Sequence, residues 1–230
     1  MLSHGLNCPK GLSCCHATNN SSTIISFLVQ LSIYKGWSGG VNSLKPSPRR
    51  KTNPHPPYTE IGGVNPLGKI PALVLDDGRV IHDSKVIIEY LETLNAPPAL
   101  IPSSPDLRIT HKQIEAIADG ISDAIVLIRL EGTRPAAMQS SDWVSRQRKK
   151  IEASVAELSR LLGEQEWFTN AGFGLGDVTT GCALGFLDFR FPEFDWRPSA
   201  PNLERLFARL SARPSFAQTM PESQALPITQ

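Results

Sequence analysis

The chain has 230 residues, 40% of them hydrophobic, and its 23 basic and 22 acidic residues leave a formal net charge of +1. That length is enough for one good-sized domain or two small ones. The near-neutral balance argues against nucleic acid or a membrane surface as a partner of the whole chain. Four cysteines are too few for a disulfide framework and favour a reducing compartment.

Residues 1–59 give the weakest structural signal. The apolar run at residues 24–34 fits a buried strand or a helix equally well, and it is about half as long as a ~20-residue membrane span. Prolines between residues 46 and 57 predict a loop. Transit peptides lack acidic residues, as this chain does before Glu60, but they are rich in arginine, which is absent before Arg49. We therefore expect neither a targeting segment nor a membrane span here.

Residues 65–94 predict a strand, a tight turn, a second strand and a helix. The apolar run 72–75 follows Pro71, and Asp77-Gly78 supplies a hairpin turn before a short strand at residues 80–82. Asp83-Ser84 then caps a helix. Its apolar face carries Ile87, Ile88, Leu91 and Leu94 at helical spacing.

Two features of this stretch go beyond folding. Ile70 precedes a proline at a strand entrance, where a cis bond is allowed and the backbone of Ile70 can present an unpaired N–H and C=O. Asp83 and Ser84 place a carboxylate and a hydroxyl beside the unpaired N–H groups of a helix start, which suits a small anion or an amino-acid head group. Each feature also has a purely structural interpretation, as a strand start and as an N-cap.

After the helix, Ala96-Pro97-Pro98 and residues 100–105 predict a linker, and every later pattern is helical. Isoleucines from Ile114 to Ile128 form one apolar stripe, and residues 144–162 carry a second. The basic residues at 146–150 have no interleaved aromatics, so they predict a solvated face rather than a nucleic-acid patch. A third helix, beginning near Gly176-Asp177, is apolar nearly all round and therefore buried, and a final helix spans 202–212.

Four motifs in order resemble the glutathione transferase family, most closely its bacterial-type or fungal members. They are NPLGKIPAL at 65–73, DSKVIIEYL at 83–91, GLGDVTTGCALGFLDFRFPEFDW at 174–196 and LSARPSF at 210–216. The resemblance implies an α/β thioredoxin-like N-terminal domain at 1–96, with 1–59 divergent. It further implies an all-α helical-bundle C-terminal domain at 104–218 and a tail at 219–230.

The same resemblance implies that the chain takes reduced glutathione as co-substrate and conjugates it to small hydrophobic electrophiles. Ile70, positioned by a cis Pro71, would pair its backbone with the cysteinyl unit, and Asp83 and Ser84 would hold the γ-glutamyl end. Lys69 lies close enough in the chain to touch the ligand. The electrophile pocket would come from residues 114–134 and 186–194. The family also implies a cytoplasmic homodimer. From the sequence itself we expect no metal, and neither nucleic acid nor membrane as a partner.

The family's buried helix starts with a capping box, in which Asp177 would be the acidic member and therefore structural. The Ser or Thr usually found three residues earlier is replaced by Gly174. Glycine is an acceptable cap, so we expect only a modest loss.

The family's thiol-activating Tyr, Ser or Cys, which follows the first strand, is not recognisable in residues 1–59. Cys8-Pro9 is the nearest match to the family's pattern for this residue. However, LSHGLN before it is a poor strand, and GLSCCH after it is a poor start of a helix. The segment is a divergent domain half, a genuine loss of the catalytic residue, or a wrong exon. Accordingly, two alternatives to a conjugating enzyme remain open: a non-catalytic binding or dimerisation module, and a glutathione-dependent thiol-disulfide oxidoreductase using Cys8.

Overall fold

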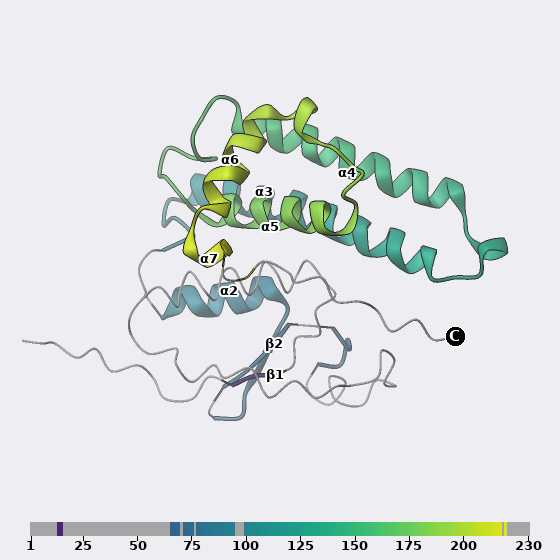
Figure 1. The fold of residues 1–230 in the computed structure, drawn as a ribbon. Helices are drawn as coiled ribbons and strands as arrows, with labels where there is room; N and C mark the ends of the chain where they lie inside the picture. Colours follow the sequence, from purple (N-terminus) through teal and green to yellow (C-terminus); the bar gives the residue numbers. More distant parts are fainter. Residues whose placement is uncertain are drawn as a thin grey trace, which may run out of the picture. The chain divides into compact units, whose positions relative to one another are not determined.

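The computed structural model describes residues 13–15, 65–69, 71–75, 77–94, 99–217 and 219. The chain divides into two compact units, of which the first is Met1–Pro97 with Pro221–Gln230 and the second is Pro98–Met220. The described part of the first unit contains a small sheet and one helix, and the described part of the second contains only helices (Figure 1).

The sheet of the first unit has the strand order β1-β2-β3, with both neighbouring pairs antiparallel. Its strands are β1 (Ser13–Cys15), β2 (Ala72–Val74) and β3 (Val80–His82). Leu73 of β2 lies between Cys14 on one side and Ile81 on the other. GLSCCH therefore contains a strand rather than a helix opening, and this strand was not recognised in the sequence.

The hairpin between β2 and β3 turns where the sequence predicts. Leu75 and Arg79 close it with a backbone hydrogen bond of 2.9 Å. Gly78 has a φ of +83°, a value that glycine adopts without strain. The Asp77 carboxylate accepts from the Arg79 N–H at 2.9 Å and from its guanidinium at 2.6 Å, so this side chain fixes the turn.

Helix α2 (Ser84–Thr93) follows β3 directly and packs on the sheet. Ile87, Ile88 and Leu91 are buried, as their spacing predicts. Leu94, the fourth residue of the predicted apolar face, is instead the C-terminal cap and is 40% exposed. The apolar face therefore ends one turn earlier than the spacing suggests.

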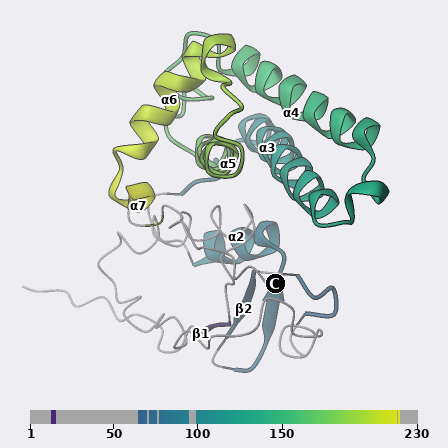
Figure 2. The same cartoon turned by 45° about the vertical axis from the view of Figure 1, so that its right-hand side comes forward.

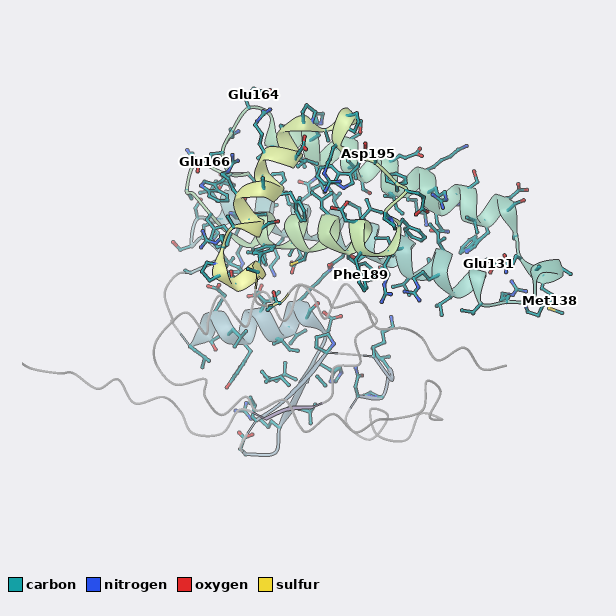
Figure 3. All side chains as sticks on the ribbon, in the orientation of Figure 1. Glu131, Met138, Glu164, Glu166, Phe189 and Asp195 are labelled. Carbon is teal, nitrogen blue, oxygen red and sulfur yellow. The ribbon has the colours of Figure 1, made fainter. Side chains whose placement is uncertain are left out.

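The second unit is built on a long antiparallel pair, α3 (Pro105–Gly132) and α4 (Ser141–Leu162). Between them, η2 (Ala136–Met138) forms the end of the hairpin, where Figure 3 places Met138. Residues 132–143 are all exposed. This end is nevertheless ordered by side chains, because the Glu131 carboxylate accepts from the Ser140 N–H at 2.7 Å and the Gln139 amide donates to the Arg134 carbonyl at 2.8 Å.

Helix α5 (Leu175–Arg190) packs against α3 and α6 (Pro201–Ser211), and Figure 2 shows it end-on between them. Almost every residue from Leu175 to Leu187 is buried, which confirms the predicted central helix. Gly181 allows close approach, since a Cβ there would lie 2.6 Å from a methyl group of Leu210 and 2.8 Å from the ring of Phe216. Phe216 belongs to the short helix α7 (Pro214–Ala217), and η3 (Arg197–Ser199) precedes α6.

Among the described residues, no helix combines the length and apolar character that crossing a lipid bilayer requires.

Candidate functional site

The loop at residues 65–69 is organised by the side chain of Asn65, which is only 2% exposed. Its Oδ1 accepts from the Leu67 N–H at 3.0 Å, and its Nδ2 donates to the Lys69 carbonyl at 2.6 Å. The Asn65 carbonyl accepts from the N–H of Gly68, whose φ is +61°. Three hydrogen bonds from one residue thus fix the approach to Pro71. Sequence reasoning assigned Asn65 no role, although Asn-Pro is a known turn signal.

Of the residues predicted on this loop, Lys69 has an exposed side chain and Pro71 is buried. Ile70 lies outside the described residues. The carbonyl of Lys69 accepts a hydrogen bond from the Asn65 amide, which fixes the backbone at this position.

Asp83 has a strained backbone. Its φ is +74° and its ψ is 129°, and it is the single non-glycine residue with a positive φ in the described part of the chain. Such a conformation costs on the order of 1–3 kcal/mol and tends to persist where the geometry has a use. The Asp83 Oδ1 accepts from the Lys85 N–H at 2.9 Å, which confirms it as the cap of α2, and the side chain is exposed.

Ser84 lies next to this carboxylate but is buried, with 7% exposure. Within the described residues its hydroxyl makes no hydrogen bond, and its oxygen is not one of the fully buried unpartnered atoms, so it stays accessible to solvent or a ligand. The start of α2 therefore offers an exposed carboxylate, an unused hydroxyl and the unpaired N–H groups of a first helical turn. These groups suit the two opposite charges of an amino-acid head group.

Asp177 is a different kind of carboxylate, with no exposure to solvent. Its two oxygens accept from the Phe168 N–H at 3.0 Å and the Gly174 N–H at 2.9 Å. Burial raises the pKa of Asp177 to about 6, while these two N–H donors act in the opposite direction. Both oxygens are thus used to hold the start of α5, which fits the predicted structural role.

The predicted electrophile pocket draws on α3 and the end of α5. Phe186 is buried, and Phe189, labelled in Figure 3, is partly exposed with the Arg190 guanidinium 4.5 Å from its ring centre. As for the thiol-activating residue, Cys8 lies outside the described residues, and Cys14 and Cys15 are strand residues paired with Leu73 and Ala72. In the described ranges, no group of three or more His, Cys, Asp or Glu side chains could hold a metal ion.

Comparison with known proteins identifies the family. Residues 43–94 match the model of the glutathione S-transferase N-terminal domain, and residues 141–209 match that of the C-terminal domain. The uncharacterized GST-like protein YibF of Escherichia coli is 40% identical over 168 residues, which are 72% of this chain and 83% of YibF. Maleylacetoacetate isomerase of Pseudomonas aeruginosa is 29% identical over 70% of this chain and 75% of its own length.

A solved structure agrees with these sequence matches. A glutathione transferase family member from Pseudomonas fluorescens, with bound glutathione, superposes with a TM-score of 0.81 at 33% identity. The match covers 92% of this chain and 100% of that one. Both halves of the thioredoxin-like plus helical fold are therefore present, and this chain belongs to the glutathione S-transferase family.

Proposed function

We propose that the chain binds reduced glutathione at the start of α2 and transfers its sulfur to a small hydrophobic electrophile. The observation that carries the proposal is the strained, exposed Asp83 beside the buried Ser84, whose hydroxyl is unused among the described residues. Asp83 would attract the ammonium of the γ-glutamyl unit, and the Ser84 hydroxyl with the first-turn N–H groups would take its carboxylate. Ile70 and Lys69 would contact the rest of the tripeptide, with Pro71 setting the backbone.

The proposed reaction is nucleophilic displacement by the glutathione thiolate. The thiol loses its proton, the sulfur forms a bond to the electrophilic carbon, and a halide or similar group leaves with the bonding electron pair. Holding both reactants in one place supplies much of the rate gain. The group that stabilises the thiolate would follow the first strand of the sheet.

A second candidate is glutathione-dependent isomerisation, which the match to a maleylacetoacetate isomerase favours. There the thiolate would add to a carbon–carbon double bond, allow rotation and leave again, so that glutathione is regenerated. Conjugation consumes glutathione, whereas isomerisation does not. The third reaction, thiol-disulfide exchange, would require a cysteine such as Cys8.

The test is glutathione retention on affinity resin, followed by three assays of the purified chain. Conjugation to an aryl halide, cis–trans isomerisation of maleylacetoacetate and reduction of a mixed disulfide separate the three reactions. Glutathione binding with no turnover in any assay would identify a binding module instead. Unchanged retention in the double variant Asp83→Ala, Ser84→Ala would contradict the proposed site.

We further propose a cytoplasmic homodimer with domains at 1–96 and 104–218. Large apolar side chains exposed in each unit support association, namely Leu67 and Val86 in the first and Ile109 in the second. Sedimentation equilibrium of the full chain tests the dimer, and a monomer at micromolar concentration would contradict it.

Asn65→Ala is expected to weaken glutathione binding by roughly 3- to 10-fold, since it removes two hydrogen bonds that order the loop before Pro71. Asn65→Asp keeps the acceptor for the Leu67 N–H but loses the donor to Lys69, so an intermediate loss is expected. Isothermal titration with glutathione gives the affinities. Equal affinity in all three proteins would show that the loop does not position the ligand.

A further inference from the structure

Helix α5 begins at a residue that has no side chain to cap it. Gly174 is the N-cap, with an extended backbone at φ −153° and ψ −168° that any residue can adopt. In a complete capping box, a Ser or Thr at this position accepts a hydrogen bond from a backbone N–H of the first turn. Asp177 performs its half of the box by accepting from the Gly174 N–H, but the other half cannot come from glycine.

An imidazole from α3 lies where that side chain would be. His111 has no exposure to solvent, and its Nδ1 accepts from the N–H of Gly176, in the first turn of α5, at 2.9 Å. A Cβ on Gly174 would lie 2.5 Å from Cε1 and 2.9 Å from Nε2 of the same ring. A serine at position 174 and the histidine at position 111 therefore compete for one space.

The far side of the ring is also occupied. Nε2 of His111 lies 3.3 Å from the hydroxyl oxygen of Thr169. Because Nδ1 acts as an acceptor, the neutral ring carries its hydrogen on Nε2 and donates it to Thr169. Both ring nitrogens are thus used, one of them to hold α5.

We infer that His111 is the missing half of the α5 cap, supplied by α3 in place of a side chain at position 174, and that this cap opens when the ring takes up a second proton. The inference concerns the second unit and is independent of glutathione binding. A second proton on Nδ1 would turn the acceptor into a donor facing the Gly176 N–H. It would also bring a positive charge to the positive end of the α5 dipole.

The charged groups that follow His111 on α3, and those at the start of α5, are engaged with other partners. On α3, Lys112 and Glu115 form an ion pair of 3.1 Å. On α5, Asp177 is engaged by two backbone N–H groups, and Arg209 of α6 acts on Asp177. Among the described residues, none of these charges hydrogen-bonds the imidazole. Burial accordingly lowers the pKa of His111 below its ordinary value of 6.5.

The lowered pKa of His111 decides how the stability of the folded state changes with pH. The stabilisation from neutral His111 is fully present above about pH 6.5 and is lost as the pH falls through the lowered pKa of the folded state. Asp177 acts oppositely, because its raised pKa penalises the folded state most above about pH 6. The measurement must therefore compare variants at position 111 rather than follow the wild-type protein alone.

A double-mutant cycle tests the shared space. In the wild-type background, Gly174→Ser is expected to lower the Tm by roughly 3–10 °C through overpacking against His111. In a His111→Ala background, the same change should lower the Tm less, since the new hydroxyl can then complete the cap and only the Leu100 carbonyl oxygen, 3.0 Å from the new Cβ, still crowds it. Gly120→Ser is the matched control, because a Cβ at Gly120 meets nothing within 4 Å. Equal losses for Gly174→Ser in both backgrounds would overturn the shared-space argument. If the single variant Gly174→Ser does not fold, recovery of folded protein in the double variant with His111→Ala supports the inference. If neither the single nor the double variant folds, the result opposes it.

The pH dependence is tested with His111→Asn, whose side-chain oxygen can replace Nδ1 as acceptor but cannot take up a proton. The wild-type advantage in chemical denaturation is expected to shrink as the pH falls from 8 to 5, by up to about tenfold in the unfolding constant per pH unit. The ring ¹⁵N resonances of His111 should show the Nε2–H tautomer. A wild-type advantage that stays constant with pH, or an Nδ1–H tautomer, would overturn the proposed opening.

Discussion

Asp83→Gly is expected to raise the Tm while abolishing retention on glutathione. Glycine accepts the φ of +74° without strain, so the variant should recover on the order of 1–3 kcal/mol. Replacing the aspartate cap by glycine costs only about a few tenths of a kcal/mol. The net gain corresponds to a Tm roughly 2–6 °C higher. If Asp83 faces the ligand's ammonium as proposed, loss of its carboxylate should weaken binding about 10- to 100-fold.

Two controls separate backbone strain from charge. Asp123→Gly makes the same substitution at an exposed site inside α3. The helical backbone there has no strain for glycine to relieve, so the variant should lose about 1 kcal/mol of folding stability. Asp83→Asn keeps the cap and the strain but removes the charge, so its Tm should stay close to wild type while its affinity falls. A lower Tm for Asp83→Gly would disprove the strain, and full retention on the resin would remove Asp83 from the site.

The largest loss of stability is expected from Asp177→Ala. The substitution leaves the buried N–H groups of Phe168 and Gly174 without acceptors, at roughly 1–3 kcal/mol each. The Tm should therefore fall by roughly 5–20 °C. Because the folded-state pKa of Asp177 is raised to about 6, the wild-type advantage over this variant should be larger at pH 4 than at pH 7.

Glutathione retention distinguishes a structural from a catalytic role for Asp177. Below its transition temperature, Asp177→Ala should retain glutathione as wild type does. Asp142→Ala, at an exposed position in the first turn of α4, is the comparison and should change the Tm by little. A stable Asp177→Ala protein without activity would assign Asp177 to the chemistry instead.

Local features were predictable because their causes lie within a few residues. The Asp77-Gly78 turn needs only a glycine and a short acid, and the cap at Asp83 needs only its place before a helical pattern. The burial of α5 follows from apolar residues all round the helix. Each of these expectations agrees with the structure.

The features that were missed depend on residues far apart in the chain. Strand β1 exists through its pairing with β2, some 60 residues later, and three residues show no periodicity of their own. His111 meets Gly176 across 65 positions, so no local pattern links them. The positive φ of Asp83 also could not be predicted from the sequence, because an aspartate N-cap ordinarily has extended backbone angles.

The end of the α3–α4 hairpin has a practical consequence for engineering. Residues 132–143 are exposed, and Glu131 and Gln139 tie the turn together without drawing on the buried helix α5. Exposed tips of this kind accept inserted sequence, because nothing behind them must be repacked. The segment around Ala136–Met138 is therefore the natural place in the second unit to graft an epitope or a fluorescent label.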